Sequence, residues 1–301
     1  MIRCISVGSL CALLTLLARV AGAAEPSMFA GPAMGTTYQV TLSRPLTKQR
    51  LGQLHRETDR LLASLDKQLS TWRQDSDATR FNAAEAGEWV DVGVDLLRVV
   101  LIGQQIHRQT HGRFDITVAP LVRWWESRLP PHKPSAQADA LLNVDPPRDL
   151  LARIGSTFIE SRPASEHHPA AIRKLAPGVQ IDLSAIGPGY AVDQIGERLV
   201  TLGSVNQLVE LGGEVRAWGR RDDGSPWRVA IQSVGSGAPP AQSIELADGM
   251  AVAVAASINE RPVIDPRTGR PGQREQLGDL IIYADSCATA DALATAALLP
   301  E

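Results

Sequence analysis

The chain has 301 residues, of which 44% are hydrophobic, and it carries a formal net charge of −3. This length can bury the core of one large or two ordinary domains. The slightly acidic balance argues against a nucleic-acid-binding protein. Aromatic residues make up 4% of the chain, too few for a platform that stacks single-stranded bases.

Residues 1–23 differ in composition from the rest of the chain. Arg3 lies near the start, an apolar stretch follows, and small residues lead up to Ala23. This order is typical of a secretory signal peptide. A retained membrane span is the weaker interpretation, because the apolar stretch is short and is interrupted by Arg19. We expect residues 1–23 to be a signal peptide, residues 24–301 to form the mature domain, and the protein to be exported.

The mature chain keeps one cysteine. Cys4 and Cys11 fall inside the signal peptide, which leaves Cys287 alone. No intramolecular disulfide is therefore possible, and stability must come from the core or from a ligand. Cys287 stands at the start of a helical pattern, where it could be a nucleophile, but we favour a small buried residue.

In chain order, the mature sequence predicts one strand, two helices and then a series of strands with helical interludes. The first strand is 36–43, and the helices 46–69 and 93–108 repeat leucine or valine at helical spacing. Polar capping residues fill 69–82, and proline-rich stretches at 128–135 and 161–170 predict loops. The later strands are 178–183, 207–219, 227–234, 250–257 and 279–285, with helices over 190–202 and 289–299. Without repeats or a long linker, this pattern predicts a single α+β domain of mixed β-sheet and packed helices.

Two turns carry residues that are typical of binding sites. "IDLSAIGPGYAVD", residues 181–193, places small residues between a strand and a helix N-terminus, which suits the close approach of a phosphate. It is not a Walker loop, because no Lys-Ser or Lys-Thr follows. "VIDPRTGRP", residues 263–271, is a rigid turn after a buried strand, since Pro266 fixes its φ and Gly269 permits a positive φ. Its composition alone leaves open whether it only reverses the chain or also holds a ligand.

The last helix carries a candidate metal site. Asp291 and Thr295 are four residues apart, so a helix would point both side chains the same way. A carboxylate and a hydroxyl are hard oxygen ligands of the kind that Mg²⁺ prefers. In the alternative interpretation Thr289 caps the helix and Asp291 complements the helix dipole.

Seven segments in a fixed order resemble one family. They are "AMGTTYQV", "LSTWRQDSDATRFN", "FDITVAPLVRWW", "IDLSAIGPGYAVD", "VELGGEVRAWG", "VIDPRTGRP" and "CATADALAT". The family is ApbE, the FAD:protein FMN transferases, and the resemblance extends from about residue 32 to residue 298. It implies that the chain uses Mg²⁺ to split FAD and attaches FMN through a phosphodiester to a threonine of a target flavoprotein, such as a subunit of a membrane redox complex. It also implies that the protein acts in the periplasm or at the outer face of the inner membrane.

The resemblance also assigns site residues. Those implied to bind FAD are Met34, Trp72, Asp115, Thr117, Gly189, Ile264 and Asp265. Asp291 and Thr295 match the family's metal-binding pair, and the backbone carbonyl of Gly187 matches its third metal ligand.

The chain departs from the family pattern at several positions. Pro262 replaces the usual His three residues before the Asp of the 263–271 turn, and Pro188 replaces the usual Lys of the glycine turn. Ala256-Ser257-Ile258 stands where relatives have Thr-Ser-Gly. Proline can neither transfer a proton nor carry positive charge. Two functions therefore remain open: a flavin transferase, or a protein of the same fold that binds FAD without transfer or hydrolyses it as an FAD pyrophosphatase.

Overall fold

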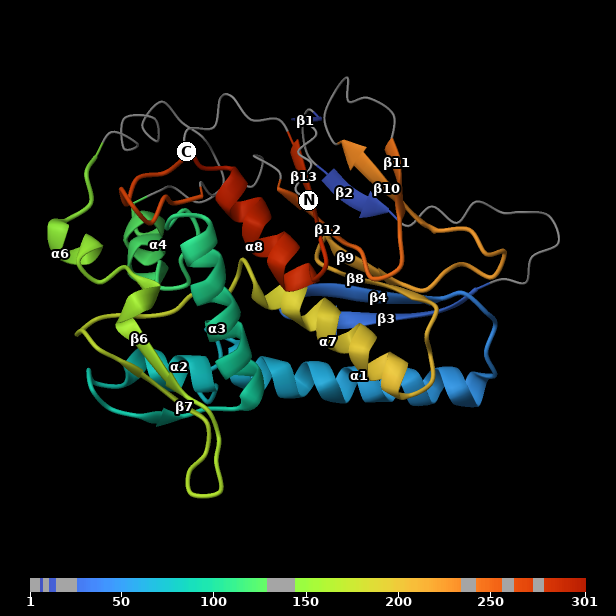
Figure 1. Ribbon diagram of the computed structural model, residues 1–301, viewed down its shortest axis with the longest axis horizontal. Coiled ribbons are helices and arrows are strands. Elements are labelled where there is room, and N and C mark those ends of the chain that lie inside the picture. The colour runs from blue at the N-terminus through green and yellow to red at the C-terminus, as the bar shows by residue number, and fades with distance from the viewer. Residues whose placement is uncertain are drawn as a thin grey trace. The chain divides into compact units, whose positions relative to one another are not determined.

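The structure is a computed structural model that describes residues 6–7, 11–14, 26–128, 144–233, 242–255, 263–272 and 279–301 (Figure 1). Its contacts group the chain into two compact units, each assembled from separate stretches. The first unit comprises Met1–Ser64, Ile186–Ser257 and Leu277–Ala294, and the second comprises Leu65–Ala185, Ile258–Gln276 and Thr295–Glu301. The α+β class predicted from the sequence is confirmed, and the bounds 24–301 of the mature domain stay a prediction.

The first unit is built on a seven-stranded sheet in the order β1-β13-β12-β9-β8-β4-β3, and every neighbouring pair is antiparallel. The strands are β1 (Ser6–Val7), β3 (Ser27–Ala33), β4 (Thr36–Leu42), β8 (Gln207–Leu211), β9 (Glu214–Trp218), β12 (Ala251–Ala255) and β13 (Asp279–Ala284). The predicted strand 207–219 is thus a hairpin, in which Gly212 and Gly213 supply the positive φ values of the turn.

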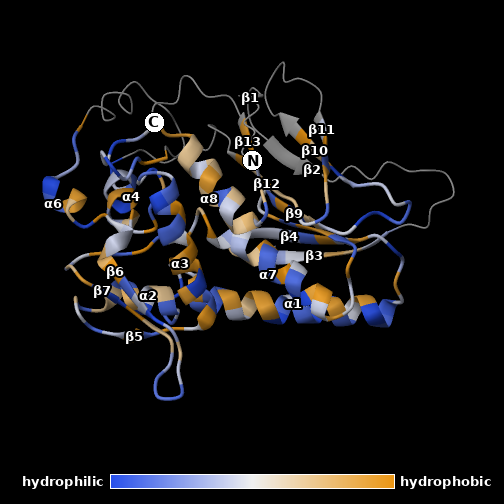
Figure 2. Cartoon of the chain, viewed as in Figure 1, coloured by the Kyte–Doolittle hydropathy of each residue, from blue (hydrophilic) through white to orange (hydrophobic). Residues whose placement is uncertain are grey.

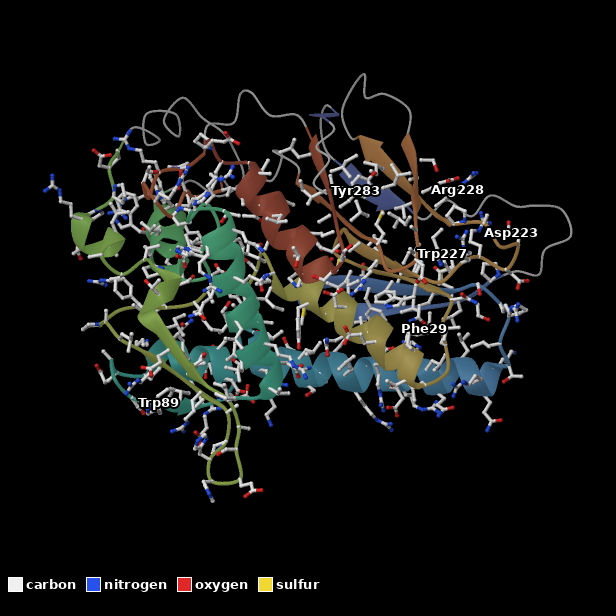
Figure 3. All side chains as sticks on the ribbon, in the orientation of Figure 1. Phe29, Trp89, Asp223, Trp227, Arg228 and Tyr283 are labelled. Atoms are coloured by element: carbon white, nitrogen blue, oxygen red, sulfur yellow. The ribbon has the colours of Figure 1, made fainter. Side chains whose placement is uncertain are left out.

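A second sheet in this unit has the order β11-β10-β2, formed by β2 (Cys11–Leu14), β10 (Trp227–Ser233) and β11 (Gln242–Leu246). One apolar core cluster joins residues of both sheets, including Trp227 of β10, Val215 of β9 and Leu246 of β11. Tyr283 of β13 packs against this cluster (Figure 3). Burial of this apolar surface stabilises the unit, which has no disulfide among its described residues.

Three helices belong wholly or partly to the first unit: α1 (Lys48–Leu69), α7 (Gly187–Thr201) and α8 (Cys287–Ala297). Figure 2 shows hydrophilic and hydrophobic residues interspersed along α1. Its buried side chains include Leu54, Leu62, Leu65 and Leu69. Within the described part of the chain, no helix has both the length and the apolar character that a membrane span requires.

The second unit combines several helices with a small antiparallel sheet in the order β5-β7-β6. Its elements are α2 (Asp77–Ala83), β5 (Val90–Asp91), α3 (Val94–Gln109), α4 (Ala119–Glu126), α6 (Arg148–Leu151), the 3₁₀ helix η1 (Ser156–Phe158), β6 (Ile159–Arg162) and β7 (Ala171–Lys174). The Ser76 hydroxyl caps α2 by accepting the Thr79 N–H at 3.0 Å, which confirms capping residues in 69–82. Most of the proline-rich stretch 128–135 lies outside the described residues.

The predicted strand 178–183 is wrong, because only Gln180 makes an isolated bridge, a parallel one, to Val118. The side chain of Asn82 makes the hydrogen bonds to Ile181 that a neighbouring strand would make. Asn82 donates its side-chain N–H to the Ile181 carbonyl at 2.9 Å and accepts the Ile181 N–H at 2.7 Å. The backbone groups of Ile181 are thus satisfied without a β-ladder, and the segment is not a regular strand. The helix that follows begins at Gly187 rather than at the predicted Tyr190.

Candidate functional site

The N-terminal turns of α7 and α8 approach each other closely in the first unit. Gly189 of α7 donates its backbone N–H to Asp291 Oδ2 at 3.1 Å. A Cβ atom at Gly189 would lie 2.4 Å from the carbonyl oxygen of Cys287. Only glycine allows this approach, so the last glycine of the 181–193 turn has a packing reason as well as its predicted role in binding FAD.

Asp193, also on α7, holds the first turn of α8. Its Oδ1 accepts the N–H of Cys287 at 2.8 Å, and its Oδ2 accepts the N–H of Ala288 at 3.0 Å. Arg216 of β9 donates to the same Oδ1 at 2.6 Å. The carboxylate thereby satisfies two of the four N–H groups that a helix leaves unpaired at its start. The predicted cap at Thr289 is wrong: Thr289 lies inside α8 and donates its N–H to the Ser286 hydroxyl at 3.3 Å.

Asp291 sits where negative charge is unfavourable. It is 7% exposed, and burial raises its pKa well above the usual value, with the neighbouring carboxylates of Glu214 and Asp193 adding to the shift. Burial likewise raises the pKa of Glu214 to about 7. A cation beside Asp291 would relieve this unfavourable environment, and the donor is the hard oxygen that Mg²⁺ prefers. The residues present therefore fit a divalent cation.

The other predicted metal ligands are placed as follows. Thr295 lies one helical turn after Asp291 on α8, and Gly187 is the first residue of α7. Within the described ranges, no three His, Cys, Asp or Glu side chains are grouped to hold a metal. A metal at Asp291 would therefore need further oxygen donors that are not carboxylates, such as the backbone carbonyl of Gly187 in the same unit, whereas Thr295 belongs to the second unit. The metal assignment itself stays a prediction.

The 263–271 turn belongs to the second unit and is held together by its own residues. Ile264 bridges to Pro271, and the Gly269 N–H donates to the Asp265 carbonyl at 2.7 Å. The Asp265 carboxylate accepts the backbone N–H of Arg267 at 2.9 Å and pairs with its guanidinium at 2.9 Å. Trp125 anchors the turn by donating its indole N–H to the Gly269 carbonyl at 2.7 Å.

The hydrogen bonds within the 263–271 turn determine which of its side chains remain accessible to a ligand. Asp265 is 4% exposed and Ile264 is 8% exposed, whereas Arg267 and Thr268 are exposed. Asp265 is well placed to fix the turn, and the exposed Arg267 and Thr268 are the side chains that a ligand can reach. The role of Ile264 and Asp265 in binding FAD stays a prediction.

Asp115 and Thr117 form the centre of a buried network in the second unit. Asp115 Oδ1 accepts from the Thr117 hydroxyl at 2.6 Å and from the Ser156 hydroxyl at 2.7 Å. Its Oδ2 accepts the Ser156 N–H at 2.9 Å and lies 2.9 Å from Nδ1 of His107. Thr117 in turn accepts the Gly155 N–H at 2.7 Å. These bonds fix the loops around Asp115, so the geometry favours support of a nearby site over direct contact with a ligand.

The ionisation of the Asp115–His107 pair follows from these contacts. Burial opposes the charge on Asp115, but hydrogen bonds from His107, Thr117 and Ser156 outweigh it and lower the carboxyl pKa. The hydrogen bond to Asp115 is the largest influence on His107 and raises the pKa of its imidazole. The pair is therefore favoured in its charged form.

Met34 and Trp72 have unusual local structures. Met34 takes φ 48° and the next residue, Gly35, takes φ 79°, in the tight turn between β3 and β4. A positive φ at a residue other than glycine is uncommon and costs free energy, and such positions cluster at functional sites. Trp72 is 86% exposed, which is high for an indole side chain. Both features are consistent with a ligand-binding role, which stays a prediction.

The structure groups the predicted residues into two sets. In the first unit Gly189 and Asp291 are in contact, close to Gly187. In the second unit the 263–271 turn approaches the loop before Asp115. A Cβ atom added at Gly112 would lie 3.4 Å from the side chain of Arg267 and 3.6 Å from that of His107.

Sequence reasoning missed Asp193, Arg216, Asn82 and His107. The sequence does contain one indication that Asp193 has a special role. "GYAVD" places this acidic residue among small and apolar helical neighbours with no cation beside it. An acid so placed needs partners from elsewhere in the fold.

The fold and the site define an α+β protein in which two helix N-termini meet beside a buried carboxylate. The sequence model of the ApbE family matches residues 34–301, and the chain belongs to this family. Among similar proteins, the FAD:protein FMN transferase of Vibrio cholerae is 33% identical over 293 residues, which cover 94% of this chain and 84% of that protein.

Solved structures agree with this assignment. The flavin transferase ApbE from Vibrio cholerae is 32% identical, with a TM-score of 0.74 over 92% of this chain and 88% of that one. The apo flavinyl transferase ApbE of Pseudomonas stutzeri is 33% identical, with a TM-score of 0.71 over 90% of this chain and 83% of that one.

Only one of the two proline departures can be placed. Pro188 lies in the first turn of α7, where the fixed φ of proline suits the helix and the missing N–H removes no intrahelical bond. It therefore fits the fold while leaving that turn without the usual Lys. Pro262 and residues 256–258 lie outside the described residues.

Proposed function

We propose that this chain transfers FMN from FAD to a threonine of a target flavoprotein, with Mg²⁺ as the required metal and AMP as the released product. In this step the acceptor hydroxyl oxygen bonds to the FMN phosphorus, the bond from this phosphorus to the bridging pyrophosphate oxygen breaks, AMP leaves with that oxygen, and the hydroxyl proton passes to water. Membership of the ApbE family makes the chain an enzyme of the flavin-transferase type. Mg²⁺, AMP release and the threonine acceptor are the parts that we add.

The observation that carries the proposal is the buried Asp291 carboxylate at the α7–α8 junction. It is nearly inaccessible, it lies near two other carboxylates, and one of its oxygens is fixed by the Gly189 N–H. A carboxylate held in this way is stable in its charged form only beside a cation. A bound Mg²⁺ would supply charge stabilisation at the FAD pyrophosphate.

The residues of the chain would bind and orient the substrate. The N-terminus of α7 carries partial positive charge and suits a phosphate group. Phosphoryl transfer depends mainly on positioning and charge stabilisation, so it does not require the usual His and Lys for a measurable rate. We expect slower transfer than in relatives, because general acid–base help is worth about 10²–10⁴ in rate.

Pro188 favours a second candidate function. Without a cation at that position, the site would stabilise charge on the pyrophosphate less well, and the chain would bind FAD without transfer or release FMN to water. These outcomes correspond to an FAD-binding protein and to an FAD pyrophosphatase.

The location and the partner follow from the same proposal. The signal-like residues 1–23 support export to the periplasm or the outer face of the inner membrane. The acceptor would then be an exported flavoprotein or a membrane redox subunit with a threonine exposed on that side.

Mass spectrometry separates these functions. The purified protein is incubated with FAD, Mg²⁺ and a candidate acceptor, and both the acceptor mass and the free nucleotides are measured. A transferase adds the FMN mass to a threonine peptide and releases an equal amount of AMP. A pyrophosphatase yields AMP and free FMN without labelling. Absence of FAD binding by a folded protein would reject all three functions.

A matched pair of variants tests the metal site in the same assay. Asp291→Asn keeps the side-chain size and removes the charge, and should abolish turnover of FAD. Asp285→Asn makes the same change at an exposed carboxylate just before α8, and should leave turnover unchanged. Equal activity of the two variants would exclude Asp291 as a metal ligand.

A further inference from the structure

Asp193 makes no predicted contact with FAD or metal, yet it holds the helix that carries Asp291. We propose that Asp193 is a positioning residue, which sets the place of the Asp291 carboxylate by fixing the first turn of α8 against α7. The inference rests on the proposed function, because it assigns Asp193 to the metal site of that reaction.

Two links, one turn apart on each helix, join α7 to α8. In the first, the Gly189 N–H donates to Asp291 at 3.1 Å. In the second, Asp193 accepts the N–H groups of Cys287 and Ala288 at 2.8 and 3.0 Å. A rigid helix turn separates the two links on both sides, so a shift at Asp193 moves Asp291 as well.

Asp193 also forms an ion pair with a cation of the sheet. Arg216 of β9 donates to it at 2.6 Å and also donates to the Gly249 carbonyl at 3.1 Å. The Arg216 guanidinium lies 4.9 Å from the ring centre of Trp218, and this ring in turn packs against Gly196 of α7. The guanidinium of Arg216 therefore has contacts of its own and balances the charge of Asp193, while the two backbone N–H groups of α8 bond both carboxylate oxygens directly.

The contacts require a carboxylate and not only a polar group. Asp193 offers two acceptor oxygens to three donors, namely Arg216 and the two backbone N–H groups of α8. Asparagine would offer one acceptor oxygen, and its amide N–H groups would face a donor. Substitution by Asn therefore leaves at least one helix N–H without a partner in a buried place, and α8 must shift or fray to restore it.

The experiment measures Mg²⁺ dependence in three variants of the full mature chain. Asp193→Asn removes the carboxylate, and Asp193→Glu keeps the charge but moves both oxygens by one methylene. Arg216→Met is the control, because it removes the same ion pair and leaves the carboxylate to cap α8. The readouts are the Mg²⁺ concentration for half-maximal FMN transfer, the Mg²⁺-dependent rise in melting temperature, and the KM for FAD.

We expect Asp193→Asn and Asp193→Glu to raise the half-activating Mg²⁺ concentration about 10–100-fold, the range found for residues that orient metal ligands. Arg216→Met should lower the melting temperature but change Mg²⁺ dependence less than about 3-fold, and the KM for FAD should stay within about 3-fold in all variants. If Asp193→Asn does not fold, the proposal is tested by comparing the Mg²⁺ dependence of Asp193→Glu with that of Arg216→Met.

Two results would overturn the inference. One is a lower melting temperature in the Asp193 variants with unchanged Mg²⁺ dependence, which indicates a purely structural role. The other is an equal change of Mg²⁺ dependence in the Asp193 and Arg216 variants, which assigns the effect to the ion pair. The melting readout needs only Mg²⁺, so it tests Asp193 even if the wild type transfers no FMN and the proposed function fails.

Discussion

Substitution of Gly189 by alanine should disrupt the α7–α8 junction. The new Cβ atom would lie 2.4 Å from the carbonyl oxygen of Cys287, 2.7 Å from its carbonyl carbon and 2.9 Å from Cα of Ala288. All three are backbone atoms, so α8 must move by about 1 Å to regain ordinary van der Waals contact. Overpacking of this kind costs about 1–3 kcal/mol, and the better helix propensity of alanine returns about 1 kcal/mol at most.

The functional effect of Gly189→Ala should exceed its effect on stability. The same shift lengthens the hydrogen bond from the residue 189 N–H to Asp291, and a 1 Å misplacement can cost about 10²-fold in rate. Thermal unfolding measures the loss of stability, and mass spectrometry of the acceptor measures FMN transfer.

Gly52→Ala is the matched control for this prediction. Gly52 lies within α1, where a Cβ would meet only the flexible end of Arg56 at 3.3 Å. The control should be as stable as the wild type or slightly more stable, because alanine favours the helix. If Gly189→Ala has the same melting temperature as Gly52→Ala and transfers FMN at the wild-type rate, the close approach of α7 and α8 does not constrain the site.

Three further predictions address other parts of the chain. Mg²⁺ should raise the melting temperature of the wild type but not of Asp291→Ala, and an equal rise in both would make Asp291 only a helix-end residue. The pKa of His107 is raised above 6.5 by its hydrogen bond to Asp115, so this contact stabilises fully below about pH 6.5 and loses its effect as pH rises through the folded-state pKa. His107→Gln should therefore lower the melting temperature more at pH 6 than at pH 9, and an equal loss at both would contradict the ionised pair. Trp72→Ala should weaken FAD binding about 5–100-fold in calorimetry, the expected loss for a base stacked on an aromatic ring, with no fall in melting temperature because the side chain is exposed.

The sequence predicts well those features that depend on local pattern. The leucine spacing of α1 and the apolar repeat of α3 follow directly from burial of one helix face. Cys287 is fully buried and its thiol pKa is raised by burial, so the expected small buried residue is confirmed over a nucleophile.

Features that depend on distant partners were beyond the sequence. The segment around Ile181 has the apolar pattern of a strand, but its hydrogen-bond partner is the side chain of Asn82, nearly a hundred residues earlier. Besides the local cap by Ser286, two N–H groups at the start of α8 bond to Asp193 on another helix, whereas capping rules consider only residues next to the helix end. The positive φ of Met34 could not be predicted either, because local preferences favour Asn or Gly at such a position.

The exposure of Trp72 gives the protein a spectroscopic property. The chain has six tryptophans, and while Trp72 is 86% exposed, Trp125 and Trp227 are 1% and 3% exposed. An indole in water emits at longer wavelengths than a buried one and is open to quenching by iodide. Flavins absorb where indoles emit, so a flavin bound beside Trp72 would dim the long-wavelength part of the emission first. The intrinsic fluorescence of the unlabelled protein can therefore report both the arrival of the flavin and the side chain that it reaches.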